Sequence, residues 1–110
     1  MNKKITIGMS ALNEGSQIEG VVKKLQTMGF AQVVVVDDGS SDDTFRKAKR
    51  AGARVMKHPI NCGAGAGVQT LVKLGRKENW EYLLLMDADG QHFPEAVSYT
   101  HLTLPTTPYV

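Results

Sequence analysis

Short apolar runs alternate along the chain with stretches in which apolar residues recur every three or four positions. The runs are β-branched or aliphatic and end in polar turns, which predicts strands at residues 4–9, 32–36, 53–57 and 82–86. The spaced stretches predict helices that run from Ser16 to Gly29, from Ser40 to Gly52 and from Val68 to Lys77. Strands that alternate with helices in this way predict right-handed crossovers and a doubly wound, mostly parallel, Rossmann-like α/β sheet.

Each predicted strand is followed by a polar or glycine-rich cluster. The clusters are Asn13 with Glu14, Asp37 with Asp38, residues 61–67, and Asp87 with Asp89. Ligands of doubly wound sheets bind outside the carboxyl ends of the strands. We therefore expect all four clusters along one edge of the sheet.

Asp87 and Asp89 stand two positions apart after a buried strand, so both carboxylates can point the same way and share one Mg²⁺ or Mn²⁺ ion. Such an ion completes its coordination with water and phosphate oxygens, which suggests a diphosphate nearby. Gln91 and His92 are close enough to add a ligand or a supporting hydrogen bond, although a surface role for either fits equally well.

Asp37 and Asp38 follow four valines. Burying a carboxylate at the end of such a strand costs desolvation free energy unless a hydrogen-bond or charge partner compensates it. Asp37 can cap local backbone N–H groups, while Asp38 can accept the imide N–H of a uracil or guanine base. Gly39 keeps the turn free of a Cβ, and Ser40 with the following helix offers N–H donors.

Other polar residues at this edge allow a functional and a purely structural interpretation. Asn13 and Glu14 can take ribose hydroxyls or simply begin a helix. The glycines at 63, 65 and 67 permit close approach of a phosphate or sugar, but their spacing misses the dinucleotide-binding fingerprint. His58 is interpreted as a loop histidine with its hydrogen bonds satisfied, and Cys62 as a small buried filler with no metal-ligand spacing around it.

Composition narrows the class of protein. A chain of 110 residues, 42% hydrophobic and 22% charged, is sized for one small globular domain. A formal net charge of +2 is far from the basic stripe that nucleic-acid binding needs. No apolar run approaches the ~20 residues of a membrane span. A single cysteine suits a reducing compartment, so we expect a cytoplasmic protein, with the full-length form at the cytoplasmic face of a membrane as an option.

The chain changes character after residue 96. Residues 97–110 carry no Asp, Glu, Lys, Arg or Gly, and the run VSYTHLTLPT at 97–106 resembles a translated reading frame of a transposon-end sequencing adapter. We therefore interpret 97–110 as a non-native tail and 1–96 as the part of the chain that belongs to the domain.

Four motifs in order, ALNE at 11–14, VDDGSSD at 36–42, HPINCG at 58–63 and MDADGQH at 86–92, resemble the family 2 glycosyltransferases. The resemblance is strongest to the dolichyl- or polyprenyl-phosphate mannose or glucose synthases. It implies the nucleotide-sugar-binding front half of a GT-A catalytic domain, within residues 4–96, and an inverting transfer from a UDP- or GDP-linked sugar to an acceptor such as a lipid phosphate.

The resemblance also implies roles for individual residues. Glu14 and Asp38 would contact the nucleoside, and Asp87 and Asp89, with Gln91, would hold the metal and the diphosphate. The full set expected at the nucleotide sugar is Ala11, Leu12, Asn13, Glu14, Asp37, Asp38, Gly39, Ser40, Asn61, Gly63, Asp87, Ala88 and Asp89.

This sequence departs from the family pattern in two respects. Ser10 stands where a proline is usual, and the acceptor half with its general base is absent. Two alternatives remain open at this point. A phospho-acceptor receiver module would use Asp37, Asp38 and Asp87 but leaves Asp89 without a role, and a dinucleotide-binding oxidoreductase would use the glycine turn.

Overall fold

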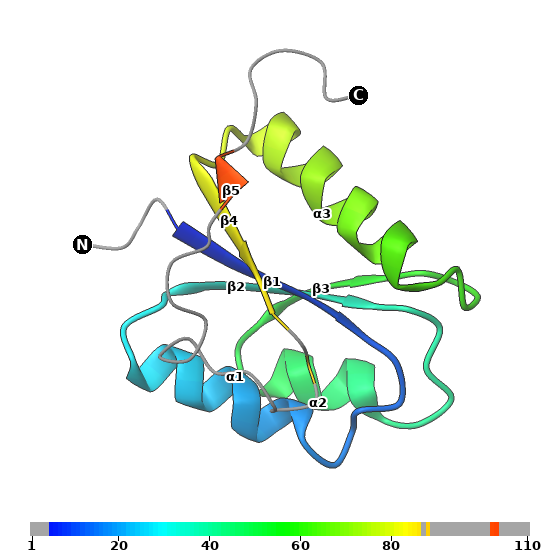
Figure 1. The fold of residues 1–110 in the computed structure, drawn as a ribbon. Coiled ribbons are helices and arrows are strands. Elements are labelled where there is room, and N and C mark those ends of the chain that lie inside the picture. Colours follow the sequence, from blue (N-terminus) through cyan, green and yellow to red (C-terminus); the bar gives the residue numbers. More distant parts are fainter. Residues whose placement is uncertain (1–4, 87, 89–101, 104–110) are drawn as a thin grey trace.

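A computed structural model describes residues 5–86, 88 and 102–103, and shows one five-stranded sheet with helices on both faces (Figure 1). The strands are β1 (Ile5–Ala11), β2 (Gln32–Asp37), β3 (Arg54–Lys57), β4 (Tyr82–Leu85) and β5 (Leu102–Thr103). The helices are α1 (Ile18–Thr27), α2 (Thr44–Arg50) and α3 (Ala64–Glu78).

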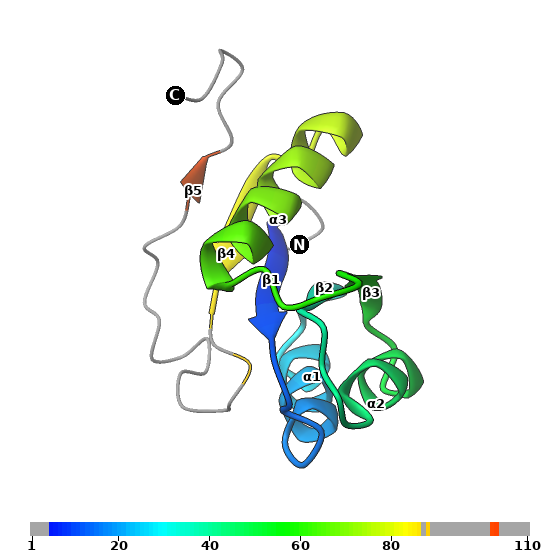
Figure 2. The same cartoon turned by 90° about the vertical axis from the view of Figure 1, so that its right-hand side faces the viewer.

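The strands lie in the order β3-β2-β1-β4-β5, and β1 to β4 run parallel. The chain moves outward from β1 through β2 to β3 and then returns to the other side of β1 for β4. This reversal places α1 and α2 on one face of the sheet and α3 on the other (Figures 1 and 2). The predicted doubly wound α/β fold is confirmed, and the carboxyl ends of β1, β2 and β4 share one edge.

The core has two halves because side chains alternate across β1 and β2. Ile7, Met9, Val33 and Val35 pack against α1 and α2, and Val34 and Val36 pack against α3 and β4. Since β2 is buried on both faces, its run of valines has the pattern of a central parallel strand.

Helix α3 begins at Ala64, four residues before the predicted start at Val68. The predicted glycine-rich turn was therefore wrong in extent, because Gly65 and Gly67 belong to the helix. A Cβ at Gly67 would lie 2.7 Å from the Cβ of Ser10, so glycine lets α3 approach the end of β1. Close packing on the sheet outweighs the low helix propensity of glycine.

Strand β5 pairs antiparallel with β4 and falls within residues 97–110. The interpretation of that segment as a non-native tail stays a prediction. Within the described part of the chain, we find no helix long and apolar enough to span a bilayer.

Candidate nucleotide-binding edge

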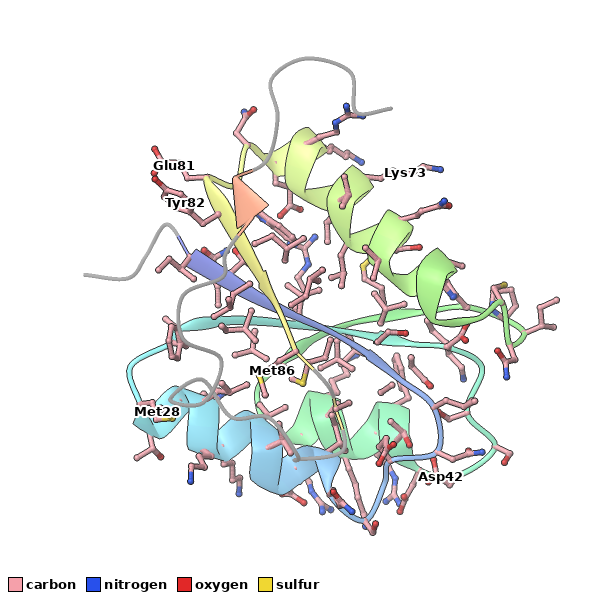
Figure 3. The ribbon with its side chains drawn as sticks, in the orientation of Figure 1. Met28, Asp42, Lys73, Glu81, Tyr82 and Met86 are labelled. Carbon is pink, nitrogen blue, oxygen red and sulfur yellow. The ribbon has the colours of Figure 1, made fainter. Side chains whose placement is uncertain are left out.

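The parallel strands bring the predicted site residues to one edge of the sheet. Ala11 pairs with Asp37, and the Asp38 N–H donates to the Ala11 carbonyl at 2.8 Å. The Met86 N–H donates to the Gly8 carbonyl at 3.1 Å, which continues the β4 side of the sheet toward the same edge. Met86 and Ala88 are buried in the α1 and α2 half of the core, and Figure 3 shows the Met86 side chain on that side of the sheet. Asp87, Asp89, Gln91 and His92 lie outside the described residues, so the metal ligands stay a prediction.

Asp38 is a buried carboxylate of this edge, with its side chain 4% exposed. Its Oδ1 lies 2.9 Å from His58 Nδ1 and accepts the Cys62 N–H at 2.8 Å, and its Oδ2 accepts the Gly63 N–H at 2.9 Å. Burial raises the pKa of this carboxyl, but the hydrogen bonds from His58 and the two backbone N–H groups outweigh it and lower the pKa. The site at the entrance of α3 therefore holds Asp38 as an anion.

His58 links Asp38 to α3. Its Nε2 lies 2.8 Å from Thr70 Oγ1, and its backbone N–H donates to the Asp37 carbonyl. The prediction that His58 has both ring hydrogen bonds satisfied is confirmed. Its partners were not predictable, because neither Asp38 nor Thr70 is close to it in sequence.

Cys62 differs from its prediction in two ways. It is exposed rather than a buried filler, because it stands in the loop that leads from β3 to α3. Asp38, His58 and Cys62 also place ligand atoms within 4.8 Å of one another, although the sequence around Cys62 has no metal-ligand spacing. The facing atoms of Asp38 and His58 are hydrogen-bonded to each other, so we describe these residues with Gly63 and Thr70 as the Asp38 cluster.

The loop before α3 also rests on the turn after β2. Gly39 has φ +77°, and a Cβ there would lie 2.6 Å from the Asn61 nitrogen and the Ile60 carbonyl carbon. The predicted need for glycine at 39 is confirmed. The Asn61 side-chain oxygen accepts the Gly63 N–H at 3.0 Å, so its described role is local to this loop.

Asp37 faces the opposite side from Asp38. It continues the alternation of Val33 and Val35, which face α1 and α2. Its Oδ1 accepts the Ser40 N–H at 3.1 Å, as the capping interpretation predicted. Its Oδ2 is buried and has no hydrogen-bond partner among the described residues.

The loops after β1 and β2 are clamped together on that opposite side. The Asn13 side-chain oxygen accepts the N–H groups of Ser41 at 2.9 Å and Asp42 at 3.3 Å, and the Asn13 N–H donates to Ser40 Oγ at 2.9 Å. Asn13, with φ +54°, thus joins the two loops; it does not begin α1, which starts at Ile18.

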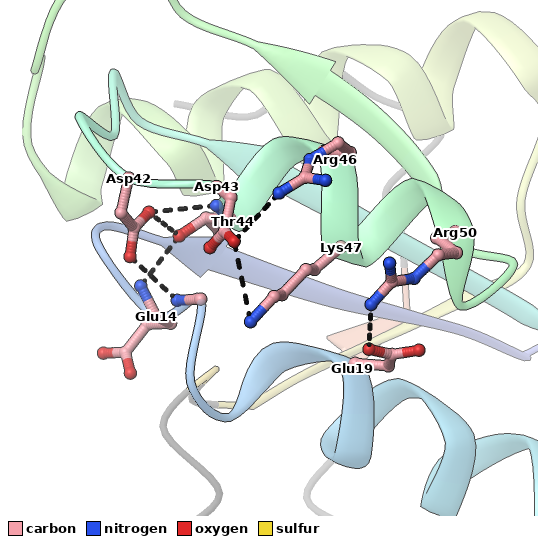
Figure 4. A network of polar contacts seen from close by, with 9 residues as sticks. Glu14, Glu19, Asp42, Asp43, Thr44, Arg46, Lys47 and Arg50 are labelled. Atoms are coloured by element: carbon pink, nitrogen blue, oxygen red, sulfur yellow. Dashed lines mark hydrogen bonds and ion pairs between the residues drawn. The ribbon is translucent and has the colours of Figure 1, made fainter.

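The clamp continues through Asp42 and Thr44 (Figure 4). Thr44 Oγ1 accepts the Glu14 N–H at 2.9 Å, and Asp42 accepts the Gly15 N–H at 3.0 Å and the Thr44 N–H at 2.9 Å. Hydrogen bonding from Thr44 is the main cause that lowers the pKa of Asp42. The Glu14 carboxylate points away from this network in Figure 4, and Leu12 is 40% exposed. We call Asn13, Gly15, Ser40, Asp42 and Thr44 the Asn13 clamp.

The sequence analysis included Asp42 in the motif at 36–42 without predicting its contact with Gly15, and it did not single out Thr44 or Thr70. The run Asp42, Asp43, Thr44 at a helix start carries a capping signal that could have pointed to Asp42 and Thr44. Thr70 sits within a helix and carries no such signal.

Comparisons with known proteins find relatives among glycosyltransferases. The chain is 28% identical over 114 residues to UDP-N-acetylglucosamine--dolichyl-phosphate N-acetylglucosaminyltransferase of Methanococcus voltae, covering 88% of this chain and 45% of the relative. It is 30% identical over 99 residues to dolichol-phosphate mannosyltransferase of Pyrococcus furiosus, covering 86% of this chain and 28% of the relative. The chain thus spans less than half the length of these relatives.

A solved structure supports the fold. Glucosyl-3-phosphoglycerate synthase of Mycobacterium tuberculosis, in complex with Mn²⁺, uridine diphosphate and glucosyl-3-phosphoglycerate, superimposes with a TM-score of 0.65 at 26% identity. The match covers 76% of this chain and 32% of that enzyme. A model of glycosyl transferase family 2 matches residues 6–101. The four-motif resemblance is therefore confirmed, and the chain belongs to glycosyl transferase family 2.

Proposed function

We propose that this chain forms the nucleotide-sugar-binding part of an inverting glycosyltransferase that takes a sugar from a UDP- or GDP-linked donor. The observation that carries the proposal is the convergence of Asp38, Glu14 and the end of β4 on one edge of the sheet. Membership of the family, and a fold shared with an enzyme solved with uridine diphosphate, support it. Neither a receiver module nor a dinucleotide-binding oxidoreductase has comparable support.

Asp38 is suited to recognise the nucleoside base. Its Oδ1 already accepts two hydrogen bonds, whereas its Oδ2 accepts one, from the Gly63 N–H. A carboxylate oxygen accepts two hydrogen bonds, so Oδ2 keeps one position for the imide N–H of uracil or guanine. Glu14, whose carboxylate is directed away from the Asn13 clamp, would take a ribose hydroxyl.

The diphosphate would lie at the end of β4. Asp87, Asp89 and Gln91 follow Met86 and are the residues that would hold Mg²⁺ or Mn²⁺. When bound, this ion would neutralise charge on the leaving nucleoside diphosphate. Related enzymes were solved with Mn²⁺ and with Mg²⁺, which supports a divalent cation without choosing between them.

A polyprenyl phosphate is the acceptor that we favour. Two relatives are named for transfer to dolichyl or dolichol phosphate. A phosphate acceptor is already anionic near neutral pH, so it needs no strong general base. Such an acceptor would place the reaction at the cytoplasmic face of a membrane.

The proposal is tested by titrating the 110-residue chain with UDP and GDP, with and without Mn²⁺, by calorimetry. We expect Mn²⁺-dependent binding of one nucleotide, lost in Asp89→Ala and retained in Glu19→Gln, which removes a carboxylate on α1 that pairs with Arg50. Retained binding in Asp89→Ala contradicts the metal assignment. Binding of NADH, or phosphorylation by acetyl phosphate, in place of nucleotide binding contradicts the transferase.

A further inference from the structure

His58 bridges two elements that the proposed nucleotide site must keep in register. It follows β3, and its ring lies between Asp38, after β2, and Thr70, on α3. The loop that carries it runs from β3 to the start of α3 (Figure 2). Its side chain is only 15% exposed, so these two contacts dominate its surroundings.

Two contacts of Thr70 Oγ1 bear on which His58 nitrogen carries a proton. Thr70 Oγ1 donates its only proton to the Ala66 carbonyl at 3.0 Å, four residues earlier in α3. An Oγ1 that donates to Ala66 accepts from His58, and this pattern places a proton on Nε2. Asp38 is an acceptor as a carboxylate, so Nδ1 carries a proton as well. Donation by both nitrogens corresponds to a doubly protonated, positively charged ring.

We propose that His58 is a positioning residue that, protonated on both ring nitrogens, orients the Asp38 carboxylate for the nucleoside base. The proposal rests on the base-binding role proposed for Asp38. The Nδ1 proton and the Cys62 N–H fill Oδ1, and the Gly63 N–H occupies one side of Oδ2. The carboxylate is thereby fixed with a single acceptor position left on Oδ2.

Cys62 supports this arrangement through its backbone and not through its thiol. Its N–H donates to Asp38, whereas its Sγ lies 3.4 Å from the Ile60 carbonyl, to which it is a weak donor. The positive charge on His58 also sets it apart from the backbone donors, because a charged donor makes the stronger hydrogen bond.

The first experiment needs no nucleotide. Two-bond ¹H–¹⁵N correlation spectra of the wild-type chain at neutral pH should show both His58 nitrogens protonated, and Asp38→Asn should change the Nδ1 signal. A neutral tautomer in the folded wild-type chain overturns the proposal, whatever the chain binds.

The second experiment uses two matched substitutions. His58→Asn puts an amide N–H near the position of Nδ1 and keeps the donor to Asp38, whereas His58→Gln puts one near Nε2 and keeps the donor to Thr70. We expect His58→Gln to weaken binding of the preferred nucleotide roughly tenfold, and His58→Asn to restore most of that loss. Unfolding curves of both variants identify any loss of folded protein.

The outcomes separate the two proposals. Equal affinity of His58→Gln and wild type, or equal loss in both variants, overturns the positioning role of His58 while the transferase proposal stands. A wild-type chain that shows the doubly protonated ring but binds neither UDP nor GDP overturns the proposed function, and with it the nucleoside role of Asp38.

Discussion

The Asp38 cluster and the Asn13 clamp have the same hydrogen-bonding pattern but differ in burial. In each, a carboxylate on one loop accepts backbone N–H groups from another. Asp38 does so in a buried position and also accepts from the His58 ring, whereas Asp42 does so in an exposed position and also accepts from the Thr44 hydroxyl. A buried acceptor that loses its donors cannot turn to water, so the Asp38 cluster should contribute more free energy than the Asn13 clamp.

The largest loss of stability is expected at Gly39, where the turn after β2 contacts the backbone of the loop before α3. Gly39→Ala would combine a positive φ with a Cβ 2.6 Å from the backbone of residues 60 and 61. We expect a loss of roughly 3 kcal/mol or more in the free energy of unfolding. Urea denaturation measures it. The matched control is Gly65→Ala in α3, where nothing lies within 4 Å and a gain of up to about 1 kcal/mol is expected.

Removing the charge of Asp38 compares the two clusters directly. Asp38→Asn places an amide where Gly63 and His58 donate, and should cost about 3 kcal/mol. Asp42→Asn, which removes the charge of the exposed carboxylate in the Asn13 clamp, should cost clearly less, because water can replace the hydrogen bonds of an exposed group. Denaturant unfolding measures both, and equal losses would refute the claim that burial decides the difference.

Acid unfolding sharpens the same comparison. Because the pKa of Asp38 is lowered from its ordinary value of 3.8, its stabilisation is complete above that pH and is lost as the pH falls through the folded-state pKa. Unfolding free energies measured from pH 5 down to pH 2 should fall less steeply in Asp38→Asn than in wild type. Asp42→Asn should change the slope less, since Asp42 is exposed. Parallel curves for wild type and Asp38→Asn would contradict the assignment.

The smallest effect is expected at the surface ion pairs between α1 and α2. Glu19 contacts Arg50 of α2 at 2.9 Å (Figure 4). It also contacts Lys23 of its own helix at 3.4 Å, and both cations are exposed. Solvent and salt screen such pairs, so Glu19→Gln should shift the Tm by no more than about two degrees at physiological salt. Calorimetric scans at low and high salt check this, and a large shift that salt does not reduce would show that the pair is structural.

Sequence patterns predicted the strands better than the start of α3. A β-branched apolar run such as 33–36 is typical of a strand that is covered on both faces. Glycines at 65 and 67 have a low helix propensity, and at Gly67 the close approach to Ser10 on β1 outweighs it. Boundaries shifted for the same reason at β1, which extends to Ala11 because pairing with β2 continues to Asp37.

At the candidate site, hydrogen bonds between residues close in sequence were predictable, whereas the partners of residues far apart in sequence were not. The capping role of Asp37 and the need for glycine at 39 follow from residues next to them in the chain. The bond between Asp38 and His58 spans 20 positions, and the contact from His58 to Thr70 spans 12.

The order of strands and helices, the family motifs and the gathering of acidic residues after strands were determined by the sequence itself. These features follow from local periodicity and from the rule that parallel strands end at a common edge. Only the tertiary structure decided which partners Asp37 and Asp38 find on their opposite sides of the sheet. Hydrogen-bond partners depend on which side chains crossovers bring within about 3 Å, and no local pattern encodes that distance.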